Sequence, residues 1–107
     1  MIRTIVVVST GAGSKVVVED PPTNNPTPQQ KAQWINVMAD EDNGGWIRHG
    51  DVSVAANIGQ QITPGGGGGA PQYPPVSGLM SYGYVLSELY IYFQNADDRA
   101  YITCLVR

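Results

Sequence analysis

The residues of this chain best suited to chemistry are one histidine and a few nearby carboxylates. His49 and Asp51 lie two positions apart in an alternating segment, so a strand would place both side chains on one face, within reach of a shared hydrogen bond. A Ser-His-Asp arrangement also needs a nucleophile, and the chain has no G-x-S-x-G motif. We therefore predict no catalytic residue, interpret His49 as an exposed strand residue, and do not expect an enzyme.

Metal and phosphate sites have little support in the sequence. Asp40 and Asp42 resemble the opening of a calcium loop, but the third ligand position is a glycine and no helices flank it, which favours an ordinary hairpin turn. Structural zinc needs about four ligands, and Cys104 with His49 supplies fewer, so Cys104 is predicted to be a small buried side chain. The run Gly65–Gly69 lacks the lysine of a phosphate loop and is interpreted as a flexible spacer. No cofactor and no metal are expected.

The overall composition limits the partners of the protein. The 107 residues suffice for one domain with a modest core, and only 14% of them are charged. Six basic residues are scattered and the net charge is −3, which argues against nucleic acid as a partner. The apolar run at 5–8 is too short for a signal peptide or a membrane span, so we expect a soluble protein made in a cytoplasm, with no membrane partner.

The first half of the chain shows the period-two pattern of β-strands. Residues 5–8 and 16–18 are β-branched runs, and the segment "STGAGSK" between them indicates a hairpin loop. Residues 31–39 predict a strand with Trp34 and Met38 on the face opposite Ile35 and Val37. The segment "DEDNGG" that follows predicts a turn, with its asparagine and first glycine suited to positive φ.

The second half continues the pattern. Residues 46–55 predict a strand in which Trp46, Val52 and Val54 alternate with polar residues, and both tryptophans of the chain are interpreted as core anchors. A tight turn at 57–59 leads back to Ile62. The segments "ELYIYFQN" and "RAYITCLVR" predict two strands joined by "ADD".

These strands together predict the fold class. We count about seven or eight antiparallel strands, with many Gly/Pro turns and no significant helix. The prediction is an all-β chain that forms a single jelly-roll-like β-sandwich over residues 1–107.

Residues 63–87 have no clear periodicity and form the longest irregular segment. A loop of this length in a small domain is usually functional. The glycine spacer followed by "QYPP", which favours an extended conformation, indicates an arm that contacts a neighbouring molecule; the alternative is a loop that folds back over its own sandwich. Because no alternating core position lies within 65–77, we expect the fold to survive deletion of that stretch.

The tyrosines are concentrated in the last third of the chain. Tyr90 and Tyr92 occupy the face opposite Ile91 and Phe93, so this strand is either central between two layers or covered by a partner. The low charge of the chain favours a subunit interface. The predicted interaction residues, for an oligomer or a larger assembly, are Gly65, Gly69, Tyr73, Pro74, Pro75, Tyr82, Tyr84, Tyr90 and Tyr92.

Two stretches resemble small virion proteins of tailed bacteriophages in their general composition and strand pattern: "WIRHGDVSVAANIGQQITPGG" and "LSELYIYFQNADDRAYITCLVR". The residues that carry the resemblance are Gly50, Asp51, Val52, Val54, Gly59, Ile62, Pro64, Gly65 and the segment 89–93. They give short Val-, Ser- and Gly-rich strands of low charge, a Gly/Pro loop and a closing hairpin. The five-glycine run and the long segment after it depart from that pattern.

The resemblance implies a β-sandwich that oligomerises, as a trimer, on the exterior of the phage head. It would act as a capsid decoration, cement or head-fibre base protein and bind the major capsid protein or other virion proteins. Related small proteins also occur at necks and tails, which is one alternative. The other is a carbohydrate-binding or host-recognition module on the virion, because the tryptophans and tyrosines are able to stack on sugars.

Overall fold

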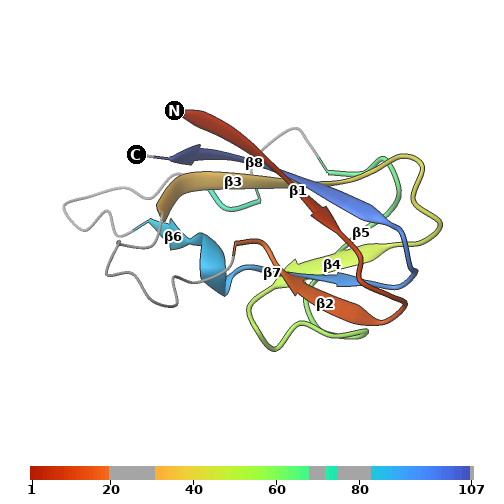
Figure 1. Cartoon of the computed structure of the whole chain (residues 1–107). Coiled ribbons are helices and arrows are strands. Elements are labelled where there is room, and N and C mark those ends of the chain that lie inside the picture. The colour runs from red at the N-terminus through yellow and green to blue at the C-terminus, as the bar shows by residue number, and fades with distance from the viewer. Residues whose placement is uncertain (20–30, 68–71, 75–82, 107) are drawn as a thin grey trace.

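The computed structural model describes residues 1–19, 31–67, 72–74 and 83–106 of the chain. Within these ranges the regular structure consists of β-strands and one short 3-10 turn (Figure 1). The strands are β1 (Ile2–Val8), β2 (Ser14–Val17), β3 (Lys31–Ala39), β4 (Ile47–Gly50), β5 (Gln60–Ile62), β6 (Tyr84–Val85), β7 (Tyr90–Phe93) and β8 (Arg99–Val106), and the turn η1 (Leu86–Glu88) joins β6 to β7. The predicted all-β class is confirmed.

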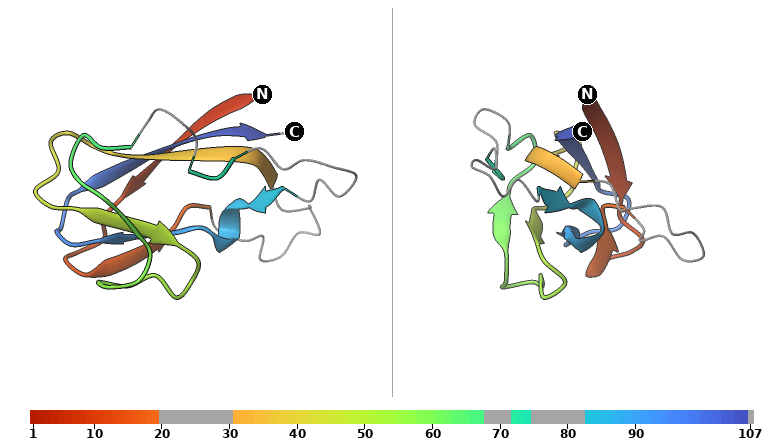
Figure 2. Two further views of the ribbon diagram at one scale, coloured as in Figure 1. Left: turned by 180° about the vertical axis from the view of Figure 1, so that it is seen from behind. Right: turned by 90° about the vertical axis from the view of Figure 1, so that its left-hand side faces the viewer.

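The strands form two antiparallel sheets of four strands each. Sheet A has the order β1-β8-β3-β6 and sheet B the order β2-β7-β4-β5. The two sheets lie one above the other as the layers of a sandwich (Figure 2). Each strand of the first half pairs with its counterpart from the second half: β1 with β8, β2 with β7, β3 with β6 and β4 with β5. This wrapped connectivity is that of a jelly roll, as predicted.

Three predicted hairpins are wrong. β1 and β2 lie in different sheets, so the segment "STGAGSK" crosses between layers. The same holds for β7 and β8 around "ADD", and for β3 and β4 around "DEDNGG". Asn43 and Gly44 also lack the expected positive φ, which Asp97 adopts instead in the β7–β8 connection. Gly and Asp signal that the chain reverses, but they do not indicate whether the next strand stays in the same sheet.

The strand expected over 46–55 ends early, at Gly50. The backbone and hydroxyl groups of Ser53 both donate to the Asp51 carboxylate, and this local turn competes with extension of the ladder. Val52 is consequently 60% exposed, while Val54 is buried. The predicted return after the 57–59 turn is confirmed, since β5 pairs with β4 in the register Ile47 to Ile62.

The core fills the space between the two sheets with the inward side chains of their strands. Phe93 and Ile91 from sheet B meet Ile102 and Val37 from sheet A, all fully buried. Cys104 is buried as predicted. The buried core cluster comprises Val7, Val18, Ala32, Ile35, Val37, Ala39, Ile47, Ile62, Leu86, Leu89, Ile91, Phe93, Ala100, Ile102, Cys104 and Val106.

Neither tryptophan is a core anchor, which corrects the sequence interpretation. Trp34 lies on the outer face of sheet A, beside Leu105, and is half-buried. Trp46 stacks on Tyr92 outside sheet B, with ring centroids 5.9 Å apart. The predicted grouping of β3 side chains is correct, but the face with Ile35 and Val37 is the one that meets the other sheet.

Described parts of the loop 63–87 run along the outer edge of β3. The amide of Gly65 donates to the Ala39 carbonyl and the Ala39 amide to the Gly66 carbonyl, both at 3.1 Å. Further along, Tyr73 and Ile35 exchange two backbone bonds of 2.9 and 3.0 Å. Tyr73 also packs against the core cluster, so the expectation of no core position within 65–77 is wrong.

Candidate functional site

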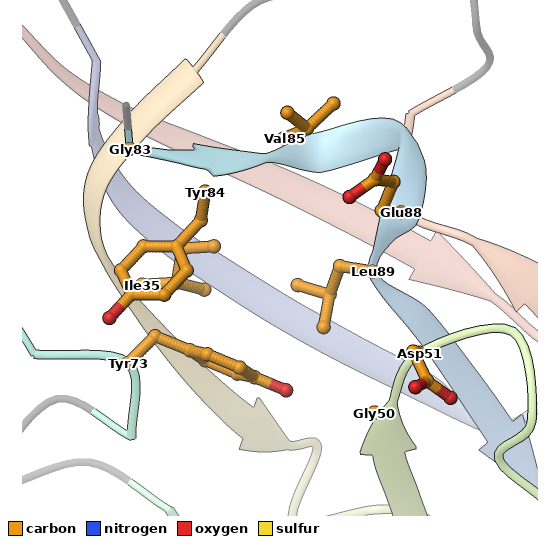
Figure 3. A pocket seen from close by; sticks show the side chains of 9 residues that line it. All are labelled: Ile35, Gly50, Asp51, Tyr73, Gly83, Tyr84, Val85, Glu88 and Leu89. Atoms are coloured by element: carbon orange, nitrogen blue, oxygen red, sulfur yellow. The ribbon is translucent and has the colours of Figure 1, made fainter. Parts of the chain in front are cut away.

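A pocket of about 240 Å³ opens at one end of the sandwich, where four separate segments meet (Figure 3). β3 supplies its base, the end of β4 one side, the residues around Tyr73 a second side, and the segment from β6 through η1 a third. Its lining residues are Ile35, Gly50, Asp51, Tyr73, Gly83, Tyr84, Val85, Glu88 and Leu89.

Two tyrosine rings form the aromatic wall of the pocket. Tyr73 and Tyr84 meet edge to face, with ring centroids 5.4 Å apart at 68°. Pairing with Ile35 fixes the backbone of Tyr73, and pairing of β6 with β3 fixes that of Tyr84. The Tyr84 hydroxyl donates to the Pro74 carbonyl at 3.0 Å, which ties the two segments together. In Figure 3 the two tyrosine side chains lie on one side of the pocket, and Glu88 and Leu89 on the other.

His49 lies beside the Tyr73 ring on the inward face of β4. It is only 3% exposed, so the interpretation of His49 as an exposed strand residue is wrong. Its Nδ1 is 3.0 Å from the Tyr73 hydroxyl, and the two ring centroids are 5.4 Å apart. Burial lowers the pKa of His49 from 6.5 to about 4, so the imidazole is neutral at physiological pH. Within the described part of the chain, its buried Nε2 has no hydrogen-bond partner.

The hydrogen bond that His49 and Asp51 could share on one strand face is not formed, because Asp51 lies beyond the end of β4 and accepts from Ser53. The side-chain and backbone hydrogen bonds from Ser53 lower the pKa of the Asp51 carboxyl. Burial, followed by the charge of Asp51, raises the pKa of Tyr73. At neutral pH the phenol of Tyr73 therefore keeps its proton and the imidazole of His49 stays uncharged.

The charged groups of the pocket are both acidic. Asp51 and Glu88 are exposed and lie on different sides of the opening, while the described lining contains no lysine or arginine (Figure 3). Carboxylate acceptors beside tyrosine faces suit a ligand rich in hydroxyl groups, or one that carries a positive charge. The pocket is therefore suited to binding a ligand of one of these two kinds.

The acidic turn after β3 holds its carboxylates in structural hydrogen bonds. Asp40 accepts from the Asp42 amide at 3.0 Å and from the Tyr101 hydroxyl at 2.8 Å. Both bonds lower the pKa of Asp40. Among the residues that the structure describes, no three His, Cys, Asp or Glu side chains gather in a way that would hold a metal ion.

The outer face of sheet A is a second candidate, because it is largely apolar. In the register of β1, β8 and β3, one row across the strands is Ile2, Leu105 and Trp34, and another is Val6, Tyr101 and Met38. The exposed fractions are 59% for Ile2, 52% for Val6, 47% for Val8 and 36% for Met38. We call Ile2, Val6, Val8, Trp34, Met38, Tyr101 and Leu105 the apolar face.

Charged residues lie at the ends of this surface: exposed Lys31 begins β3 at one end, and two charged residues lie at the other. Arg99 lies beside Val8, and Asp40 follows the last residue of β3. The middle row consists of the uncharged residues Thr4, Thr103 and Asn36. The surface therefore consists of apolar rows separated by one polar, uncharged row, and exposed apolar surface framed by polar residues is typical of protein–protein contacts.

The outer face of sheet B has a different character. Tyr90 and Tyr92 point outward from β7, opposite the buried Ile91 and Phe93, as predicted. Cations cover part of this aromatic surface: the Lys15 ammonium lies 5.7 Å from the Tyr90 ring centre, and the Arg48 guanidinium 5.1 Å from that of Trp46. The two tyrosines are half-buried and belong to sheet B, whereas Tyr73 and Tyr84 are held by β3 of sheet A.

The predicted interaction residues therefore separate into groups. Tyr73, Pro74 and Tyr84 come together at the pocket, Tyr90 and Tyr92 lie on sheet B, and Gly65 bonds to the edge of β3. Gly69, Pro75 and Tyr82 lie outside the described residues.

Sequence reasoning missed Glu88 and the apolar face. The one available signal was the uninterrupted β-branched run at 5–8, which is too apolar on both of its faces for a half-solvated strand.

Comparisons with known proteins give no match. No protein-family model, curated protein or solved structure matches this chain. Among the described residues there is also no helix with the length and apolar character needed to cross a membrane.

Proposed function

We propose that this chain is a non-enzymatic structural protein of a tailed-phage virion that binds the exterior of the head as a decoration or cement protein. The observation that supports this most directly is the apolar face of sheet A. A rigid, weakly charged β-surface is suited to cover the seams between capsid subunits, where it adds binding energy without catalysis.

The rest of the molecule is consistent with that role. The jelly roll is an architecture common among viral structural proteins. The net charge of −3 favours a position away from packaged DNA. The partner in this proposal is the major capsid protein, with a homo-oligomer as the bound unit; placement at the neck or tail remains the closest variant of the proposal.

Cosedimentation tests this function. Heads assembled without this chain are mixed with the purified protein, with Met38→Lys as a variant that places a charge on the apolar face. The matched control is Ile58→Lys, because Ile58 is an exposed apolar residue of the 55–58 turn, away from that face. We expect the wild type and Ile58→Lys to sediment with heads and Met38→Lys to stay in solution. Failure of the wild type to bind heads would refute the proposal.

A second candidate function, carbohydrate recognition, is favoured by the pocket. The rings of Tyr73 and Tyr84 offer stacking surfaces, and the carboxylates of Asp51 and Glu88 offer acceptors for sugar hydroxyl groups. A glycan array, repeated with Glu88→Gln, separates this function from the first. Saturable binding by the wild type that the variant loses would make host recognition the primary role.

A further inference from the structure

β1 lies at the edge of sheet A, so the backbone N–H and C=O groups of every second residue in it point away from the sheet. The N-terminal ammonium of Met1 donates to the Val106 carbonyl and the Val106 amide to the Met1 carbonyl, both at 2.9 Å. At the other end, the Ser9 amide donates to the Asp98 carbonyl at 2.9 Å. In an antiparallel ladder such bonded pairs recur at every second residue. The odd residues of β1 therefore bond to β8, and the N–H and C=O groups of Ile2, Thr4, Val6 and Val8 point away from the sheet.

The other sheet edges are short or covered within the described residues. The outer side of β3 is occupied in turn by β6, by Tyr73 and by residues 65–67. The edges of sheet B are β2, with four residues, and β5, with three. β1 has seven residues, pairs with β8 without a bulge, and contains no proline. Long, regular edges without such protection are the ones that pair with another chain.

We propose that two copies of this chain pair through their β1 strands, antiparallel about a two-fold axis at Ile5. In this register Ile2 faces Val8 of the second copy and Thr4 faces Val6. All outward groups are then satisfied by about eight N–H···O bonds. Such an interface is isologous, because each strand presents the same groups to the other.

The side chains of β1 fit a second copy of the same strand. Arg3 is its only charged residue, and it faces Val7 in this register, so no like charges oppose each other. Arg3 is also engaged in an ion pair with Glu19 at 3.1 Å within its own chain. Pairing brings the two copies of Ile2, Val6 and Val8 into contact and merges the two apolar faces into one surface across a continuous sheet. This two-fold dimer differs from the trimer that the phage resemblance implies, and it does not depend on the proposed capsid role.

Proline substitutions test the edge directly. The Val6 amide points away from β8, so Val6→Pro is expected to keep the fold and block pairing. The adjacent Val7→Pro is the matched control, since that amide belongs to the inward set and its loss should destabilise the monomer. We expect light scattering to give a dimer mass for the wild type and a monomer mass for Val6→Pro with unchanged circular dichroism. If Val6→Pro is misfolded, Val6→Lys, which uses the charge typical of natural edge strands, takes its place.

Two further measurements distinguish edge pairing from face-to-face stacking. Met38→Lys changes the apolar face two strands away from the edge and is expected to leave the dimer mass unchanged. Hydrogen exchange of the Thr4, Val6 and Val8 amides should slow as protein concentration rises, while the Ile5 and Val7 amides are protected at every concentration. A monomeric or trimeric wild type, a dimer that survives both Val6 variants, or a dimer abolished by Met38→Lys would each overturn the proposal.

Discussion

Mild acid should destabilise this protein through His49. The imidazole is buried beside Tyr73, and its pKa in the folded state is about 4, against 6.5 for an unperturbed histidine. Between these two values the unfolded chain binds a proton that the folded chain excludes. The stability that neutral His49 provides is therefore fully present above about pH 6.5 and is lost as the pH falls toward 4.

The magnitude follows from the two pKa values. Each tenfold difference in proton affinity corresponds to about 1.4 kcal/mol. The loss in the free energy of unfolding is then about 2 kcal/mol near pH 5 and about 3 kcal/mol near pH 4. Asp40 and Asp51, whose pKa values are lowered, contribute stability that is lost only below their ordinary value of 3.8. His49 therefore dominates the pH range above that value.

Urea unfolding of the wild type and of His49→Gln, measured from neutral pH to about pH 4, isolates this effect. Glutamine can keep a hydrogen bond to the Tyr73 hydroxyl but does not titrate in this range. We expect the wild type to lose the 2–3 kcal/mol calculated above, while the variant changes little. NMR of the imidazole should give the folded-state pKa directly. Parallel pH profiles for the two proteins would refute the buried, neutral assignment.

Three further predictions concern single sites, each measured by the denaturant midpoint. Tyr73→Phe leaves Nδ1 of His49 without its partner and should cost about 1–3 kcal/mol. Asp97→Gly should stabilise the protein by up to about 1 kcal/mol, because Asp97 has φ +66° and glycine adopts such angles without strain. Gly67→Ala should destabilise the fold by more than about 1 kcal/mol, since Gly67 has φ +94° and an added Cβ would collide with the Val37 carbonyl; NMR shifts along β3 should report the local displacement.

The strands and their faces were predictable because side-chain alternation is a local property. Ile91 and Phe93 point inward and Tyr90 and Tyr92 outward, as the period-two pattern requires. Burial of Cys104 follows from the same pattern in the last strand. The all-β class was therefore available from local alternation.

The pairing of the strands and the pocket were not predictable in the same way. A turn sequence such as "ADD" reverses the chain equally well within one sheet or between two, and only the wrapped topology decides which occurs. The pocket joins Tyr73 and Tyr84 from distant segments, with His49 of a third segment bonded to Tyr73, and no local pattern relates them. His49 shows the limit most clearly, because Asp51 and Ser53 end the strand just after it and break the alternation used to place it.

The central position of β8 in sheet A has a consequence for how the chain reaches its fold. β8 lies between β1 and β3, yet it is the last strand to be synthesised. Until it is available, the edges of both neighbours have no partner in the sheet, and the core lacks Ile102, Cys104 and Val106. Pairings this distant in sequence fold slowly and expose apolar edges on the way. The sandwich is therefore expected to close only after β8 has been made, with the apolar strand β1 vulnerable to aggregation until β8 pairs with it.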